Sequence, residues 1–138
     1  MSSDRFLDTN ILVYAHKEGD YRTEIARQLL FEGGVIGAQV LNEFASVARA
    51  KLGFTWPKVQ EAVDNILILC PNPRALNVAT HLRALGLSKR FGFSIWDGLI
   101  VAAAIEAKCS TLLTEDLQHG QVVEGVRIEN PFLRTAAP

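Results

Sequence analysis

The sequence predicts an α/β protein, in which helices cover both faces of a central parallel sheet. Short apolar stretches of strand length alternate along the chain with longer segments whose apolar residues recur every three or four positions. This alternation is typical of parallel sheets, because the helix that connects two strands packs on a face of the sheet. The chain has 138 residues, and no repeat, linker or low-complexity tract divides it. We therefore expect a single domain over residues 1–138.

Composition sets the broad class of the protein. Hydrophobic residues make up 49% of the chain and charged residues 21%, which is typical of a globular protein with a sizeable core. The formal net charge is -1 and the pI is near 6.3, so the chain lacks the footprint of a strongly basic nucleic-acid binder. That balance does not exclude nucleic acid, because a cluster of carboxylates can mask a local basic face.

Location and redox state follow from a few segments. Residues 1–5 do not form a signal peptide, and the apolar run 99–105 is too short to cross a bilayer. Cys70 and Cys109 match no zinc or redox spacing, so we expect both to be buried apolar side chains. We expect a cytoplasmic protein with no membrane contact.

Apolar periodicity and end signals place the elements. The expected strands are 5–7, 35–36, 66–70, 111–114 and 126–129, the last at an edge of the sheet. The expected helices are 11–16, 22–31, 39–51, 56–66, 74–89 and 98–107. Residues 133–138 are expected to be a disordered tail.

Several end signals support these helices. Thr9 or Asn10 is expected to cap the first, Thr55 precedes Pro57 at the start of the fourth, and Ser94 opens the sixth. Asp97 lies three residues after Ser94, where it can complete a capping box. The fifth helix is expected to bury one stripe of apolar residues: Leu76, Ala79, Leu82 and Leu85.

Four acidic residues lie where a predicted strand ends or a predicted helix begins: Asp8, Glu43, Asp97 and Asp116. Each has an ordinary explanation by itself, as a turn aspartate, a helix cap or a complement to a helix dipole. Helices of an α/β fold run antiparallel to the strands, so helix starts and strand ends meet at the carboxyl edge of the sheet. Ligands bind at that edge in open α/β sheets. We therefore expect the four acids to share one rim.

Crowded carboxylates point to a metal ion. Two carboxylates ~4 Å apart repel by about 4 kcal/mol at an effective dielectric near 20. Four of them must take up protons, separate, or surround a cation. Oxygen ligands without histidine or thiolate select hard ions such as Mg²⁺ or Mn²⁺. The chemistry that follows is metal-dependent hydrolysis of a phosphoester.

The same residues carry a resemblance to a known family. The segments 6–10 (FLDTN), 40–44 (VLNEF), 94–97 (SIWD) and 113–117 (LTEDL) resemble the motifs of PIN-domain ribonucleases. The chain is most similar to the VapC-type toxins of bacterial toxin–antitoxin pairs. Four motifs in the right order and spacing, over residues 4–132, are far more specific than any one of them.

The resemblance implies a three-layer α/β/α sandwich with a five-stranded parallel sheet, and RNA cleavage that depends on Mg²⁺ or Mn²⁺. It implies that Asp8, Asp97 and Asp116 are catalytic metal ligands, and that Glu43 is a ligand or a water-positioning base. It further implies a cognate antitoxin that inserts a basic side chain, and a homodimer. Beside the acids, a set of hydroxyl and amide residues would donate hydrogen bonds to them: Thr9, Asn10, Ser94 and Thr114. Gly37 and Ala38 depart from the family, because many relatives have a serine or threonine there.

Residues that contact RNA are less well defined by the sequence. Candidate phosphate contacts are Arg22, Arg27, Arg49, Lys51, Lys89 and Arg90, although solvated surface charge is the commoner role of such residues. Trp96 is expected in the core rather than stacked on a base, and His119 is expected to be incidental to catalysis. His16 and His81 have no ligand spacing.

Two other functions remain open at this stage. A non-catalytic PIN module for RNA binding or scaffolding would lack one or more of the four acids, and none is missing. A phosphatase with Asp8 as its nucleophile would carry a second aspartate two residues later, where this chain has Asn10.

Overall fold

The computed structural model describes residues 4–134 of the chain. Of the expected disordered tail, residues 135–138 therefore lie outside the described residues. Leu133 is exposed, and the guanidinium of Arg134 lies 3.6 Å from the centre of the Tyr21 ring. Between residues 4 and 134, no helix is both long and apolar enough to cross a bilayer.

The described residues contain six helices and four strands. These elements do not alternate as predicted, because all six helices follow one another between the first strand and the second. In chain order they are β1 (Arg5–Leu7), α1 (Thr9–Ala15), α2 (Arg22–Glu32), α3 (Ala38–Ala50), α4 (Trp56–Leu69), α5 (Val78–Phe91), α6 (Ile95–Glu106), β2 (Thr111–Leu113), β3 (Val122–Val123) and β4 (Val126–Glu129). The mixed α/β class predicted from the sequence is confirmed.

The sheet has the order β1-β2-β4-β3, and its first three strands are parallel. The expected five-stranded, wholly parallel sheet is wrong in two respects. β3 was not predicted, and it pairs antiparallel to β4, so β3 rather than β4 is the edge strand. The expected strand at 35–36 is reduced to an isolated parallel bridge between Val35 and Phe6, beside β1.

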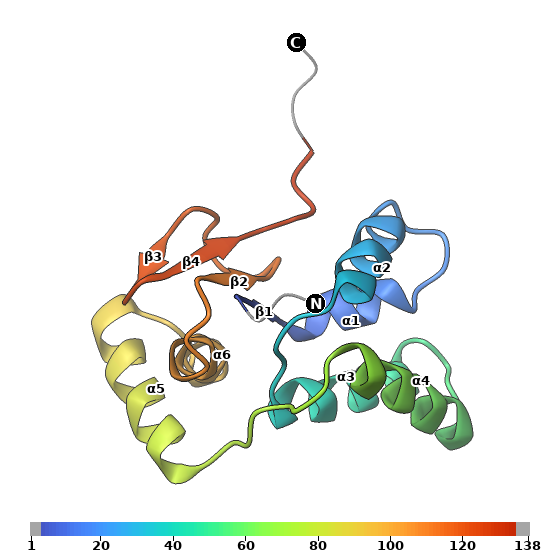
Figure 1. The fold of residues 1–138 in the computed structure, drawn as a ribbon, viewed down its shortest axis with the longest axis horizontal. Helices are drawn as coiled ribbons and strands as arrows, with labels where there is room; N and C mark the ends of the chain where they lie inside the picture. The colour runs from blue at the N-terminus through green and yellow to red at the C-terminus, as the bar shows by residue number, and fades with distance from the viewer. Residues whose placement is uncertain (1–3, 135–138) are drawn as a thin grey trace.

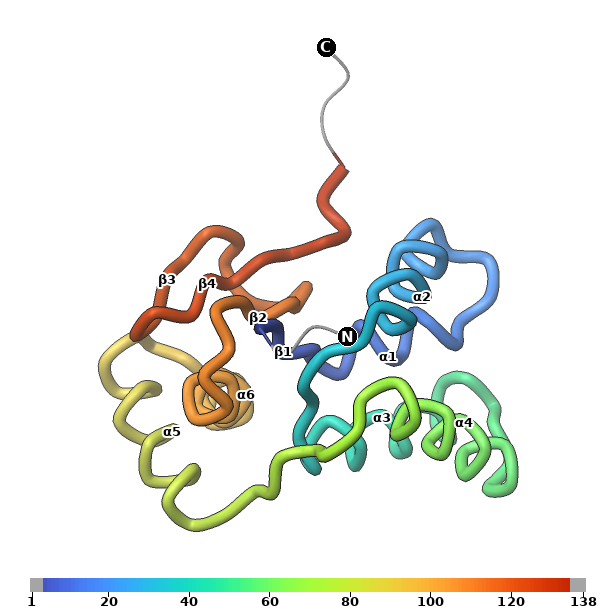
Figure 2. Tube along the Cα trace, viewed as in Figure 1, coloured from blue at the N-terminus to red at the C-terminus, as the bar shows by residue number. Residues whose placement is uncertain are grey.

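The helices form two groups beside the sheet. Figure 1 shows α5 and α6 on one side and α1 to α4 together on the other. The tube in Figure 2 shows how the chain between α4 and α5 passes from one group to the other, and how β1 and β2 lie side by side although they come from opposite ends of the chain. One hydrophobic core joins the two groups through the sheet, with Phe6, Phe44 and Phe132 among its largest buried side chains.

The expected strand at 66–70 is instead the last turn of α4. The amide of Cys70 donates to the carbonyl of Ile66 at 2.7 Å, which is the spacing of an α-helix. Ile66 and Cys70 are buried while Ile68 is 73% exposed, so the apolar run has a helical buried face. An uninterrupted apolar run fits a buried strand and a helix end equally well, and here the preceding helical pattern decides. Both cysteines are free and buried, as predicted.

α5 begins four residues later than expected and buries a different face. Asn77 caps it by accepting from the amide of Thr80, and the buried residues are Thr80, Ala84 and Leu87. The predicted core stripe is wrong, because Leu82 is 60% exposed and Leu85 43% exposed. Small residues occupy the buried face because α6 packs against it closely: a Cβ at Gly98 would lie 3.0 Å from the Ala84 carbonyl oxygen.

Candidate active site at the acidic rim

Parallel pairing of β1 and β2 determines where two of the acids lie. Leu7 and Leu113 are register partners at the ends of these strands, so the residues that follow them leave the sheet at the same edge. Asp8 directly follows β1, and Asp116 follows β2 after Thr114 and Glu115. We call Asp8, Glu43, Asp97 and Asp116 the acidic rim.

Asp8 is almost completely buried, at 6% exposure. Its two carboxylate oxygens accept hydrogen bonds from the amide of Thr9 at 2.7 Å and from the hydroxyl of Thr114 at 2.8 Å. Asp8 therefore caps α1, in place of the expected Thr9 or Asn10. Burial raises the pKa of Asp8 to about 6, and the charges of Asp116 and Glu43 raise it further against the lowering effect of the two hydrogen bonds.

Asp116 is held by the residues around it rather than by burial. Its carboxylate accepts from the side-chain amide of Asn10 at 3.3 Å, and its backbone amide donates to the hydroxyl of Thr114 at 3.1 Å. The pKa of Asp116 is raised by partial desolvation and by the negative charges of Asp97, Glu115 and Glu43. The Thr114 hydroxyl thus links Asp8 to the turn that carries Asp116.

Glu43 reaches the rim from α3. Its two carboxylate oxygens accept from the hydroxyl of Thr9 at 3.2 Å and from the side-chain amide of Gln39 at 2.7 Å. Glu43 is the sixth residue of α3, so the expectation that it lies where this helix begins is wrong, and the helix dipole does not explain it. Gln39 was not predicted, although its position four residues before Glu43 places both on one helix face. α3 begins after Gly37 without a side-chain cap.

Asp97 is the acid with the fewest partners. It lies in the first turn of α6, and its backbone amide donates to the Ser94 hydroxyl at 3.1 Å, so Ser94 caps the helix as predicted. In the described part of the chain, the Asp97 carboxylate accepts no hydrogen bond and forms no ion pair, so the second half of the expected capping box does not form. Ser94 therefore positions the helix start rather than donating to a rim carboxylate.

A group of charged and aromatic side chains supports the turn that carries Asp116. Glu115 accepts from the hydroxyl of Tyr14 at 2.7 Å and from the guanidinium of Arg22 at 2.8 Å. Arg22 also lies 4.0 Å from the centre of the Tyr14 ring and binds Asp20 through two nitrogens. The amide of Glu115 donates to the side-chain oxygen of Asn10 at 3.3 Å. The sequence did not reveal this support, because its members are distant along the chain.

The donor chemistry of the rim fits a hard divalent cation, since every candidate ligand is a carboxylate oxygen. Between residues 4 and 134, however, no three acidic, histidine or cysteine side chains lie close enough together to hold one ion as they stand. Burial is the largest cause of the raised pKa values of Asp8 and Asp116, and the negative charges of neighbouring acids raise both further. The residues present thus fit the ion by the chemistry of their donor atoms.

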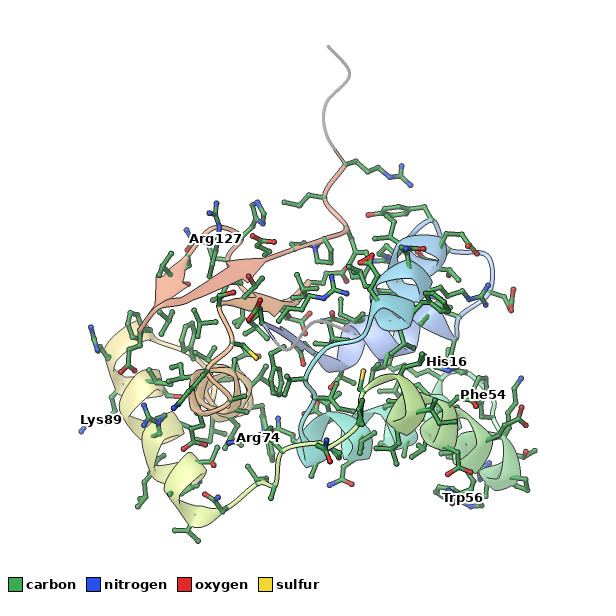
Figure 3. The ribbon with its side chains drawn as sticks, in the orientation of Figure 1. His16, Phe54, Trp56, Arg74, Lys89 and Arg127 are labelled. Carbon is green, nitrogen blue, oxygen red and sulfur yellow. The ribbon has the colours of Figure 1, made fainter. Side chains whose placement is uncertain are left out.

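Two hollows differ in how they relate to this rim. A groove of about 420 Å³ between α1 and α3 is lined by Glu43 and Asp116. A larger one, about 620 Å³, lies at the opposite end of α6 around Arg74, Arg83 and Lys108, and none of the four rim acids lines it. The groove rather than the larger hollow is therefore the one connected to the candidate chemistry. Figure 3 shows Arg74 between α6 and the chain that enters α5.

The other aromatic and histidine predictions have mixed outcomes. Trp96 is 65% exposed beside the rim, so the expectation that it lies in the core is wrong. His119 accepts from the amide of Asn130 at 3.0 Å, which gives it a structural role in its loop. His16 lies near Phe54, as Figure 3 shows, with the two ring centres 6.4 Å apart. Its Nδ1 forms a hydrogen bond with the carbonyl of Leu12.

Comparisons with known proteins identify the family. The model of the PIN domain family matches residues 5–124. A comparison with curated proteins finds no match. Among solved structures, a toxin–antitoxin complex from Klebsiella pneumoniae is similar at 19% identity and a TM-score of 0.69, over 95% of this chain and 98% of that one.

Two further solved structures share the fold. VapBC2 from Rickettsia felis, bound to a DNA fragment from its promoter, has 22% identity and a TM-score of 0.63, over 91% of this chain and 97% of that one. VapC20 of Mycobacterium tuberculosis, described as a Sarcin-Ricin loop cleaving toxin, has 17% identity and a TM-score of 0.62, over 78% of this chain and 86% of that one. The fold is thus that of VapC-type toxins, and the chain belongs to the PIN domain family.

Proposed function

We propose that this protein is a metal-dependent endoribonuclease, the toxin of a bacterial toxin–antitoxin pair, and that the acidic rim is its active site. The observation that supports the proposal is that hydrogen bonds through Thr9, Asn10 and Thr114 link Asp8, Glu43 and Asp116, which come from three separate segments, at the edge of the sheet where β1 and β2 end. Charge interactions join the four acids pairwise: Asp8 with Asp116 and Glu43, and Asp116 with Asp97. Family membership and the RNA-cleaving neighbour support RNA as the substrate class.

The catalytic ion in this proposal is Mg²⁺ or Mn²⁺, held by Asp8, Asp97 and Asp116 with Glu43 as a ligand or a water-positioning base. Such an ion lowers the pKa of a bound water and neutralises the charge that develops on the leaving oxygen. The chain's own residues prepare this site. Thr114 and the Thr9 amide orient the Asp8 carboxylate, Asn10 orients Asp116, and Gln39 with the Thr9 hydroxyl orients Glu43. Residues that orient ligands raise metal affinity.

Exposed apolar side chains support the proposed protein partners. Trp96 and Leu76 lie beside Glu43 at the mouth of the rim, and Leu82 and Leu85 form an exposed stripe on α5. Exposed apolar patches of this kind mark protein interfaces. We propose that a cognate antitoxin covers the rim with a basic side chain and that two copies of the chain form a dimer. The solved toxin–antitoxin complexes support the first of these.

The experiment is incubation of the protein with total RNA and Mg²⁺ or Mn²⁺, followed by mapping of the cut ends. We expect discrete cuts that EDTA suppresses and that the variant Asp8→Asn does not make. Full cleavage in metal-free buffer, or by Asp8→Asn, would contradict the mechanism. RNA binding without any cleavage by the unaltered protein would favour a non-catalytic PIN module.

The structure also argues against the phosphatase alternative, which requires a second aspartate two residues after Asp8. Asn10 stands where that mechanism needs an aspartate, and its amide is used to hold Asp116 and the backbone of Glu115. A side chain that is committed to positioning the rim does not supply the proton that a leaving alcohol requires.

A further inference from the structure

The groove between α1 and α3 connects the acidic rim to two lysines. Glu43 and Asp116 line it at the rim, and Lys17 and Lys51 line it beyond the ends of α1 and α3. α1 and α3 pack against each other, so the two helices form its walls. The groove therefore carries negative charge where the chemistry is proposed and positive charge farther along.

Helix geometry gives the distance between these ends. Lys17 lies seven positions after Asn10, and Lys51 lies eight positions after Glu43. At 1.5 Å per residue, the lysines are about 10–12 Å along the helices from the rim residues of the same helix. A stacked nucleic-acid strand advances ~3.4 Å per nucleotide, so this distance corresponds to about three nucleotides.

Between the rim and the lysines, the lining of the groove is suited to contact nucleotide bases rather than phosphates. Val13, Val47 and Leu52 line the groove and are partly buried, and Tyr14 lines it with its ring. Apolar and aromatic side chains beneath a cationic track are the usual construction of surfaces that bind single strands. A strand that reaches the rim with one phosphate can therefore place its bases on this floor.

The two lysines are also more available than the arginines nearby. Lys17 has one ion pair, 3.5 Å from an Asp20 carboxylate that Arg22 already binds at 2.8 Å. Lys51 has no ion pair or side-chain hydrogen bond in the described part of the chain.

Each arginine of α2 and α3 that the sequence suggested for RNA is committed elsewhere. Arg22 binds Asp20 and Glu115, Arg27 binds the carbonyl of Ala15, and Arg49 binds the carbonyl of Phe54 and lies over Trp56. Lys89 lies on the outer side of α5, as Figure 3 shows.

We propose that the RNA strand leaves the acidic rim along this groove, with Lys17 and Lys51 contacting phosphates within about three nucleotides of the cut. The inference rests on the proposed ribonuclease function and adds to it the residues that hold the strand. A protein segment is the other possible occupant of the groove. Charge favours RNA, because two lysines at the far end attract a polyanion whose next phosphate must reach the rim.

The test compares Lys17→Gln and Lys51→Gln with the matched control Lys108→Gln, which lies at the opposite end of α6. Binding of a fluorescent single-stranded RNA in Mg²⁺ is measured at several salt concentrations, with every protein carrying Asp8→Asn to prevent cleavage. We expect each groove variant to bind RNA about three- to fivefold more weakly. Each lost phosphate contact should also reduce the slope of log K against log salt by about 0.7. The control should change neither quantity.

Substrate length gives an independent readout. The substrates are RNAs with one to five nucleotides on the 5′ or the 3′ side of the mapped cut. Their cleavage rates are measured with the unaltered protein and with the lysine variants that retain Asp8. On one side of the cut, shortening the RNA to a single nucleotide should remove the difference between the groove variants and the unaltered protein, because the strand no longer reaches the lysines. Shortening the RNA on the other side of the cut should leave this difference between the groove variants and the unaltered protein unchanged.

The outcomes separate this inference from the function on which it rests. Groove variants that keep the full affinity and salt slope would overturn the proposed path and leave the groove to a protein partner. An unaltered protein that neither binds nor cuts RNA would instead refute the proposed function. Circular dichroism melting of each variant shows whether it is folded.

Discussion

Asp8 and Asp116 lie on one side of the rim, where side-chain hydrogen bonds connect the ends of β1 and β2 and the start of α1. Asp97 lies on the other side, at the start of α6, and its carboxylate has no hydrogen-bond partner in the described residues. The first side is preorganised, because its carboxylates are oriented by groups from several elements. The second side keeps a carboxylate that has no hydrogen bond or ion pair in the described residues.

The difference suits the proposed function, in which the carboxylates gather around a cation. In the described residues the acids have not converged into a group of metal ligands. Fixing every carboxylate in the absence of the ion would cost several unfavourable charge contacts at once. Three of the four carboxylates are held by hydrogen bonds and one is left free, and the raised pKa values are those of Asp8 and Asp116.

The largest expected effects come from replacing one ligand on each side. Because removing a residue that merely orients a ligand costs 10–100-fold, we expect Asp8→Asn and Asp97→Asn each to lower RNA cleavage by more than about 100-fold. Their effects on folding should differ. A pKa raised from 3.8 to about 6 corresponds to about 3 kcal/mol against the ionised, folded form of Asp8.

Asp8→Asn should therefore raise the free energy of unfolding at pH 7, whereas Asp97→Asn should lower it by about 0.3–1 kcal/mol through the lost interaction with the helix dipole. Urea denaturation at pH 7 measures both values. If Asp97→Asn instead had the higher free energy of unfolding of the two variants, the predicted difference between the two sides of the rim would be wrong.

The support beneath Asp116 is tested next. Arg22→Met removes the ion pair with Glu115 and keeps much of the packing on Tyr14. We expect about tenfold weaker Mn²⁺ affinity, measured by titration calorimetry, because the turn that carries Asp116 loses an anchor. The control is Arg27→Met, whose pairs with Glu18 and Glu24 are exposed and include no residue of that turn. Unchanged Mn²⁺ affinity in Arg22→Met would show that Tyr14 and Asn10 hold the turn without it.

The pH dependence of stability and of cleavage should reflect the titration of Asp8, on the preorganised side of the rim. The pKa of Asp8 is about 6 in the folded protein and its ordinary value is 3.8, so the folded state binds more protons than the unfolded state between these pH values. The stability contributed by protonated Asp8 is therefore complete below pH 3.8 and is lost as the pH rises through 6. Metal-dependent cleavage should change in the opposite direction, and we expect it to fall about fivefold between pH 6 and pH 5, because the ionised fraction of Asp8 falls by about that factor. The measurement is the initial rate at subsaturating Mg²⁺ across this range, because saturating metal would compete with the proton, and a rate that is flat down to pH 4.5 would contradict the prediction.

The smallest effect concerns the helix that carries the free ligand. Ser94→Ala removes the cap of α6 and should lower the free energy of unfolding by about 1 kcal/mol. Because Ser94 does not contact a rim carboxylate, cleavage by the folded protein should change less than threefold, whereas Thr114→Val should reduce it far more. A large loss of cleavage in Ser94→Ala at full folding would show that the position of α6 is as critical as the hydrogen bonds of the other side.

Particular residues show why parts of the fold and site were predictable. Asp8 and Asp116 follow apolar segments directly, and Asp97 follows a serine cap by three residues, so local sequence was enough to place each at the end of an element. The short strand β3 and the helical end of α4 were not predicted. Two residues carry too little pattern for a strand, and an apolar run such as 66–70 has the same composition in a strand and in a helix.

Contacts between distant segments were likewise beyond the local pattern. Gln39 binds Glu43 within one helix and could have been found from its spacing, but the support of Glu115 by Tyr14 and Arg22 joins residues about a hundred positions apart. The buried face of α5 was also misassigned, because Thr80 and Ala84 are buried by the close approach of α6 and not by their own hydrophobicity.

By itself, the order of residues determined the mixed α/β class and placed Asp8, Asp97 and Asp116 at or near element ends, since both depend on the chemistry of neighbouring positions. Tertiary structure alone decided which acids are held and which is free, and which lysines line a groove that begins at them. The physical reason is that orientation and pKa depend on the groups within a few ångströms of a carboxylate, and in a parallel sheet those groups come from opposite ends of the chain.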